Sequence, residues 1–135
     1  MNARTWSILA AVGLDGKADA LCTDLSHGER RLLEIGITLA TEAKLLLLDE
    51  PLAGLGEADR ERVSGLIRAL GRSHAVLLIE HDIDRVLAMS DRITVLHQGR
   101  LIADGKPAAV AANPEVVRAY LGTAPGSSPR EPVAA

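Results

Sequence analysis

Two acidic residues follow a run of four leucines, and they are the residues best suited to chemistry in this sequence. The run, residues 45–48, has the length of a buried strand, and Asp49 and Glu50 stand at its carboxyl end, just before Pro51. Ligands of open α/β sheets bind at this end of the strands. Asp49 offers hard oxygen atoms that suit Mg²⁺, and Glu50 can polarise a water for attack. The alternative is that both acids only cap the next loop.

A histidine follows the next apolar run along the chain. Residues 75–79 again have the length of a strand, and Glu80, His81 and Asp82 come directly after them. A neutral imidazole at this place can donate a hydrogen bond to a phosphate oxygen or orient a water. The alternative, which is more common for a lone histidine, is a hydrogen-bonded turn residue.

A third polar group opens a long helical stretch. Ser26 and Glu29, three residues apart, form the pattern of a capping box. Together with His27 and Gly28 they also place a hydroxyl, a glycine and free backbone N–H groups at a helix start, which is a common phosphate site. Taken alone, the segment is more typical of a capping box than of a phosphate site. The order and spacing of all three polar groups is much more specific for phosphate chemistry than any one of them.

The framework predicted around these groups is an α/β fold with parallel strands. Helical periodicity covers residues 27–43 and 57–72, and apolar side chains surround most of the first helix, so we expect it to be largely buried. Strands are expected at 44–49 and 75–79, the first covered on both faces. A strand, a helix and a strand at this spacing predict a parallel pair with a crossover helix.

Smaller elements are expected in the rest of the chain. A short helix is predicted over 83–89, and a hairpin over 92–103 that turns at Gln98-Gly99. Asn113 precedes Pro114, which is the pattern of a capped helix with proline in its first turn.

Composition and sequence pattern predict the structure of the two ends of the chain. Residues 6–14 resemble either a short amphipathic helix ended by Gly13 or the apolar part of a signal peptide, and we favour the helix. Residues 123–135 are rich in proline, glycine, serine and alanine, and we expect them to form a disordered tail after a single domain over 1–122.

Composition limits the class of protein. The 135 residues carry a net charge of −3, only 1% of them are aromatic, and there is one cysteine. These values argue against nucleic acid as the main partner and exclude an internal disulfide framework or a multi-cysteine zinc site. No apolar run approaches the roughly 18 residues of a membrane-spanning helix. We therefore expect a soluble, cytoplasmic domain.

Taken together, the motifs resemble the carboxy-terminal half of ATP-binding-cassette (ABC) ATPases, the nucleotide-binding subunits of transporters. Residues 25–29 resemble the signature motif, and residues 45–49 resemble Walker B. Glu50 matches the catalytic glutamate, residues 52–56 occupy the D-loop, and His81 matches the switch histidine.

The resemblance runs from about residue 13 to residue 122 and implies part of a P-loop NTPase fold, with parallel strands, crossover helices, and a carboxy-terminal hairpin and helix. The ending, residues 100–105 followed by 113–122, is similar to importers of branched-chain amino acids and urea. The implied function is that of a partial ATP-binding subunit, which couples ATP hydrolysis to import.

Partners and residue roles follow from the resemblance. Two such subunits meet head to tail and dock on transmembrane permease subunits at the inner face of the membrane. The resemblance implies that the γ-phosphate of ATP held by the opposite subunit would be bound by Ser26, His27, Gly28 and Glu29. It also implies that Asp49 would hold Mg²⁺ through water and that Glu50 would position and deprotonate the attacking water. His81 would contact the γ-phosphate.

Two departures from the family pattern alter this expectation. No Walker A motif is present, because Gly16-Lys17 and Gly105-Lys106 lack the required glycine spacing and the following serine or threonine. Gly56 also stands where the D-loop usually has Asp or Asn. We therefore expect no ATP hydrolysis by this chain alone, and an exposed edge on the strand at 45–48.

Two alternatives to the importer function stay open. One is a non-catalytic remnant or interaction module that keeps the fold, which the absent Walker A favours. The other is a secreted or scaffold protein that uses the same strand–helix–strand core. The joint presence of Ser26, Asp49, Glu50 and His81 favours the ATPase over the scaffold.

Overall fold

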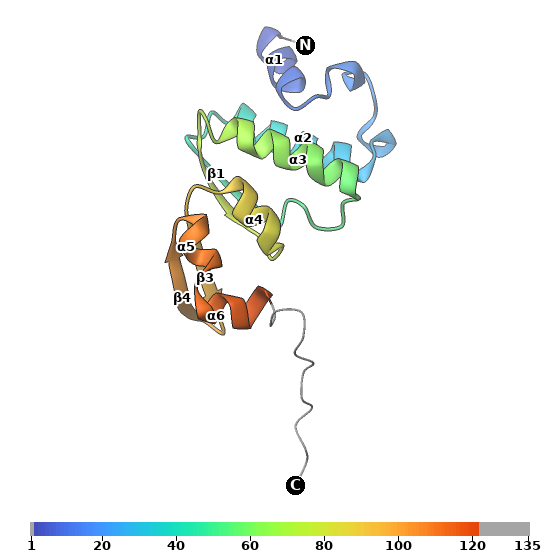
Figure 1. Ribbon diagram of the computed structural model, residues 1–135. Helices are drawn as coiled ribbons and strands as arrows, with labels where there is room; N and C mark the ends of the chain where they lie inside the picture. Colours follow the sequence, from blue (N-terminus) through green and yellow to red (C-terminus); the bar gives the residue numbers. More distant parts are fainter. Residues whose placement is uncertain (1, 122–135) are drawn as a thin grey trace. The chain divides into compact units, whose positions relative to one another are not determined.

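The computed structural model describes residues 2–121, and the predicted tail at 123–135 lies outside them (Figure 1). The chain divides into two compact units, Met1–His81 and Asp82–Ala135, and each is described by itself. Among the described residues, no helix has the length and apolar character needed to cross a membrane.

The first unit contains a pair of parallel strands, three α-helices and two short 3₁₀ helices. Strands β1 and β2 pair in parallel, with Leu47 opposite Leu77 and Asp49 opposite Ile79, which confirms the predicted pair. The elements are α1 (Ala3–Ala11), η1 (Asp15–Lys17), η2 (Cys22–Asp24), α2 (His27–Ala40), β1 (Leu45–Asp49), α3 (Glu57–Leu70) and β2 (Ala75–Ile79).

The first helix, α1, begins and ends at clear local signals. The side chain of Asn2 accepts a hydrogen bond from the backbone N–H of Thr5 and so caps the helix. Gly13, just after the helix, has a φ of 70°, a left-handed conformation that glycine adopts without strain. The predicted helix that ends at Gly13 is therefore confirmed.

Helices α2 and α3 lie side by side and supply much of the buried apolar surface of this unit (Figure 1). Leu32 and Ile35 of α2 are buried, as are Val63 and Ile67 of α3. Ile37 of α2 is exposed, so the expectation that α2 is buried around most of its circumference was wrong. The helix is amphipathic instead, because one side of it has no neighbour among the described residues.

Strand β1 is covered on one face only. Leu46 and Leu48 are buried, whereas Leu45 and Leu47, which alternate with them, are exposed. The prediction that this strand is covered on both faces was wrong, because no element among residues 2–121 lies on the second face. The predicted exposed edge is confirmed, since within the described part of the chain this sheet contains only β1 and β2.

The second unit is built around a hairpin. It comprises α4 (Ile83–Met89), β3 (Ile93–His97), β4 (Arg100–Gly105), α5 (Pro107–Ala111), α6 (Pro114–Val116) and the π-helical η3 (Val117–Leu121). β3 and β4 are antiparallel, and both turn residues, Gln98 and Gly99, have positive φ, which confirms the predicted hairpin and its turn.

Apolar side chains from three elements form the core of this second unit. Ile93 and Val95 of β3 pack with Val110 of α5 and Val116 of α6. Asn113 accepts hydrogen bonds from the backbone N–H groups of two residues that follow it, so the predicted helix cap is confirmed.

Ser64 is an unfavourable residue in the middle of α3, and it gives the first testable prediction. Its side chain is buried and its hydroxyl has no hydrogen-bond partner among residues 2–121, which costs stability. Ser64→Ala should raise the free energy of unfolding by about 1 kcal/mol, because it removes the unpaired hydroxyl and adds a better helix former. The urea midpoint measures the change.

Ser73→Ala is the matched control. The Ser73 hydroxyl donates to the carbonyl of Leu70 at 3.4 Å and lies 2.9 Å from Nδ1 of His74, so its removal should leave stability unchanged or lower it. A midpoint that falls in Ser64→Ala would contradict the unfavourable role of that hydroxyl.

Candidate functional site

Glu50 and His81 meet at the carboxyl edge of the parallel strands. The backbone N–H of Glu50 donates to the carbonyl of Ile79 at 2.9 Å, which extends the pairing one residue beyond β1. Oε1 of Glu50 then lies 3.4 Å from Nδ1 of His81. The two residues predicted to act in catalysis are therefore neighbours, although a helix, α3, and a strand, β2, separate them in the sequence.

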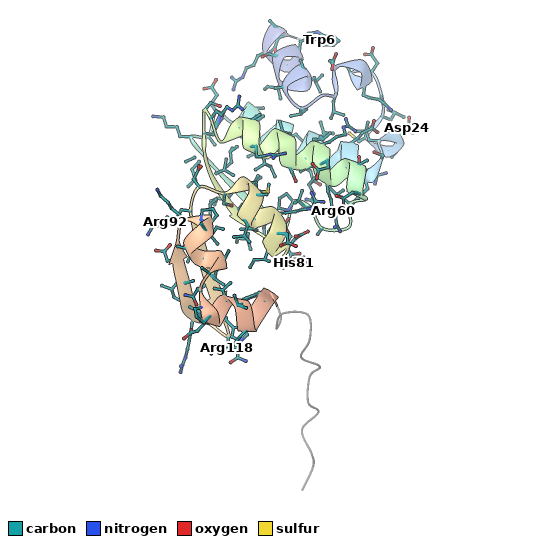
Figure 2. All side chains as sticks on the ribbon, viewed as in Figure 1. Trp6, Asp24, Arg60, His81, Arg92 and Arg118 are labelled. Atoms are coloured by element: carbon teal, nitrogen blue, oxygen red, sulfur yellow. The ribbon has the colours of Figure 1, made fainter. Side chains whose placement is uncertain are left out.

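The Glu50–His81 pair is open to solvent. The side chain of His81 is 72% exposed and that of Glu50 is 52% exposed, and Figure 2 shows His81 on the segment that leaves β2. A polar contact between side chains with this exposure adds little to stability. The contact matters because it places a carboxylate and an imidazole together where a bound substrate could reach both.

The backbone of Glu50 has an unusual conformation. Its φ is 43°, in the left-handed region that residues with side chains seldom adopt. Its carbonyl accepts a hydrogen bond from Ala53, which starts the turn after the strand. Such conformations are most frequent at functional sites, where the surrounding structure maintains them.

Asp49 lies on the exposed face of the parallel strands. It occupies the last position of β1, in register with Ile79, and alternation places it on the same sheet face as Leu45 and Leu47. Among residues 2–121 there is no group of three or more His, Cys, Asp or Glu side chains that could hold a metal. The exposed Asp49 carboxylate fits Mg²⁺ only as one oxygen donor among several, the rest of which come from water or a nucleotide.

Glu80 has a positioning role that the sequence did not reveal. Its Oε1 accepts a hydrogen bond from the backbone N–H of Leu52 at 2.9 Å, and Leu52 itself is buried. The contact ties the end of β2 to the loop that follows Glu50. Its only sequence signal is that Glu80, like Glu50, follows a strand of a parallel pair.

The predicted capping box at the start of α2 is confirmed. The Ser26 hydroxyl accepts a hydrogen bond from the backbone N–H of Glu29 at 3.2 Å, and the Glu29 carboxylate accepts one from the backbone N–H of Ser26 at 2.9 Å. Lys17 lies 3.3 Å from the other carboxylate oxygen of Glu29. The backbone hydrogen bond from Ser26, assisted by Lys17, lowers the pKa of Glu29.

His27 and Gly28 connect the start of α2 to the loop and helix after β1. Gly28 is buried, and a Cβ at this position would collide with the carboxylate of Asp59 in α3, so only glycine fits without movement of that side chain. Nε2 of His27 would lie 3.4 Å from a Cβ at Gly54, in the same loop as Leu52. The predicted signature segment, residues 25–29, and the predicted D-loop are therefore neighbours.

Gly56 leaves α3 without a side-chain cap. It is the N-cap residue of α3, its φ and ψ are −69° and 164°, and no side-chain hydrogen bond caps the helix. The absence of the usual Asp or Asn side chain at this D-loop position thus removes a helix cap as well as a polar group.

The structure brings some of the predicted site residues together and leaves others apart. Glu50 and His81 are in contact, and Asp49 adjoins Glu50. In the part of the chain that the structure describes, no hydrogen bond or ion pair joins Ser26 or Glu29 to any of these three residues.

Comparisons with known families and curated proteins identify close similarities. The profile of the family described as "ABC transporter" matches residues 1–53, and that of "Branched-chain amino acid ATP-binding cassette transporter" matches residues 100–125. The high-affinity branched-chain amino acid transport ATP-binding protein LivG of Escherichia coli K12 is 42% identical over 91% of this chain and 48% of its own length. BraF of Pseudomonas aeruginosa is 42% identical over 86% of this chain and 46% of its own length.

A solved structure has the same fold. The crystal structure of an ATP-binding cassette of an ABC transporter in its ADP conformation superposes with a TM-score of 0.77 and 30% identity, over 89% of this chain and 49% of that chain. The chain thus spans about half the length of the relatives and the structure that it matches.

The hydrogen bond from Leu52 to Glu80 predicts a local change in backbone protection. Glu80→Ala removes the acceptor, so the amide hydrogen of Leu52 should exchange about tenfold faster. Glu80→Gln keeps an oxygen acceptor and should stay near the wild-type rate. Amide hydrogen exchange followed by NMR measures both, and Glu34→Ala, on the exposed side of α2, is the control. An unchanged Leu52 rate in Glu80→Ala would show that the contact does not hold this loop.

The lowered pKa of Glu29 predicts a pH-dependent contribution to stability. Because the pKa is lower in the folded state, the stabilisation is fully present above the ordinary value of 4.5 and is lost as the pH falls through the folded value. The difference in unfolding free energy between wild type and Glu29→Gln should be constant from about pH 6 to 8 and shrink below about pH 4.5. Chemical denaturation at each pH measures it, and a difference that persists unchanged at pH 3 would contradict this account.

Proposed function

The chain belongs to the ABC transporter family of ATP-binding proteins, and from this premise we propose that it is the carboxy-terminal part of the ATP-binding subunit of a branched-chain amino acid importer. The observation that carries the proposal is the 42% identity to LivG over 91% of the chain. The match of residues 100–125 to the branched-chain amino acid family supports the same class of solute.

The proposed reaction is hydrolysis of MgATP, in which the protein acts by positioning and electrostatics. The Glu50 carboxylate orients the attacking water and accepts its proton. The His81 imidazole, 3.4 Å from Oε1 of Glu50, donates a hydrogen bond to the γ-phosphate. Asp49 holds the magnesium ion of the substrate through water. The left-handed backbone of Glu50 separates the two adjacent acids, so that each has its own task.

The signature segment is proposed to act on a second ATP. In a head-to-tail pair of subunits, Ser26, His27, Gly28 and Glu29 would face the γ-phosphate of ATP bound to the opposite subunit. The lack of any hydrogen bond or ion pair from Ser26 and Glu29 to Asp49, Glu50 and His81 within the described residues supports this division of roles. The assembly would dock on transmembrane permease subunits at the cytoplasmic face of the membrane.

One further candidate function is a module that keeps the fold but does not hydrolyse ATP. The sequence has no Walker A motif, so the glycine-rich phosphate cradle and its lysine must come from another segment of polypeptide. Gly56 also removes a polar side chain from the D-loop. The missing Walker A motif and Gly56 both favour this non-catalytic module. The module becomes the better interpretation if no added segment restores hydrolysis.

The experiment that tests the proposal is reconstitution of hydrolysis. The chain alone should show no release of phosphate from MgATP, and addition of the portion of E. coli LivG that this chain does not match should restore it. Glu50→Gln in this chain should then lower kcat at least 100-fold, because it removes the base. Glu42→Gln is the matched control, since Glu42 is an exposed glutamate with positive φ that pairs with Arg4.

Three results would overturn the proposal. Turnover by the chain alone would show that it needs no separate phosphate cradle. Restored turnover that Glu50→Gln leaves intact would remove Glu50 from the catalytic role. A complex that forms and does not hydrolyse ATP would favour the non-catalytic module.

A further inference from the structure

A hollow of about 270 Å³ lies on the second unit, between its hairpin and its last helical segment. His97 of β3 and Ile102 of β4 line it from the hairpin, and Glu115 of α6 with Arg118 and Ala119 of η3 line it from the helical segment. Figure 2 shows Arg118 near the turn of the hairpin. We call these five residues the hairpin pocket. Its volume is just below that of pockets for drug-sized molecules, so it suits a smaller ligand.

The two walls of the hairpin pocket are tied together by contacts of neighbouring residues. The side-chain amide of Asn113 donates a hydrogen bond to the carbonyl of Ile102 at 3.3 Å, and the hydroxyl of Tyr120 donates one to the carbonyl of Leu96. Val116, in the middle of the helical segment, is fully buried in the core of the unit. The pocket is therefore formed before a ligand arrives, which lowers the cost of binding.

Two opposite charges of the hairpin pocket have no partner within the described residues. Glu115 and Arg118 stand three positions apart, a spacing at which side chains of a helix often form an ion pair. Among residues 2–121, however, no ion pair or hydrogen bond involves the carboxylate of Glu115 or the guanidinium of Arg118. Both groups are therefore available to a ligand that carries a negative and a positive charge.

The lining of the hairpin pocket matches a free apolar α-amino acid. A guanidinium such as that of Arg118 binds a carboxylate through two parallel hydrogen bonds, and the carboxylate of Glu115 can accept hydrogen bonds from an ammonium group. Ile102 and Ala119 supply apolar surface for the ligand side chain. A nucleotide or a simple anion fits less well, because Glu115 would repel its negative charge. A peptide end carries only one of the two charged groups.

We propose that the hairpin pocket binds one free apolar α-amino acid, with its carboxylate on Arg118 and its ammonium group on Glu115. The inference goes beyond the proposed function and does not rest on it, because the lining residues alone define the class of ligand. Glu50 and His81 belong to the other compact unit, so the bound amino acid is a regulatory ligand and not the substrate of those residues.

The experiment compares ligands on the wild-type chain in the absence of nucleotide. The full chain, isotopically labelled, is titrated with L-leucine and followed by NMR. The amide signals of Ile102 and Ala119 should shift saturably, with a Kd of about 1 mM or less. Isocaproate, which lacks the ammonium group, and isoamylamine, which lacks the carboxylate, should each bind at least tenfold more weakly. L-aspartate should also bind at least tenfold more weakly, because its second carboxylate would face apolar side chains.

Substitutions of the two charged residues give a second readout. Arg118→Gln and Glu115→Gln should each raise the Kd for L-leucine at least tenfold, and Arg118→Lys, which keeps the charge but not the forked geometry, should have an intermediate Kd. Arg68→Gln is the matched control, since Arg68 is an exposed arginine in the last turn of α3, and its Kd should equal that of the wild type. If circular dichroism shows that a variant does not fold, the ligand comparison on the wild-type chain still decides.

Three outcomes would contradict the inference. They are no saturable shift with L-leucine, isocaproate that binds as tightly as L-leucine, which would make the pocket a simple anion site, and a Kd for L-leucine that neither glutamine variant raises. Binding in the expected pattern by a chain that cannot be restored to ATP hydrolysis would uphold the inference and refute the proposed function. Restored hydrolysis without L-leucine binding would do the reverse.

Discussion

The parallel pairing of β1 with β2 is the constraint on which the candidate site depends. Its register runs from Leu45 opposite Ala75 to Asp49 opposite Ile79, and the hydrogen bond from Glu50 to Ile79 continues it. Because both strands run in the same direction, the residues that follow them emerge at the same edge. A shift of the register by one residue would turn Leu46 and Leu48 out of the core and move Glu50 away from His81.

The same alternation that builds the core also leaves one face of the β1–β2 sheet exposed. Every second residue of β1 is buried, and the residues between them face solvent. Asp49 is exposed on the same face as Leu45 and Leu47. A segment that covered these two leucines would therefore also control the access of a ligand to Asp49. The candidate site and the exposed apolar side chains are therefore linked through a single strand of five residues.

The sequence was most informative where a structural signal is local. The capping box at Ser26, the helix end at Gly13 and the Asn113 cap each need only neighbouring residues, and all three were predicted correctly. The coverage of α2 and β1 was predicted wrongly, because an apolar side chain shows a preference for burial but not the presence of a covering layer. The contacts of Glu80 with Leu52 and of Gly28 with Asp59 depend on tertiary packing, which no local pattern records.

The structural and functional interpretations of the signature segment are compatible. The capping box uses the backbone N–H groups of Ser26 and Glu29 and the acceptor capacity of both side chains. The backbone N–H groups of His27 and Gly28, in the first turn of α2, have no acceptor within the helix. The hydroxyl hydrogen of Ser26 is also not used by the cap. The cap thus fixes the helix start and leaves three donors for an anion, so the same residues can stabilise the fold and bind a phosphate.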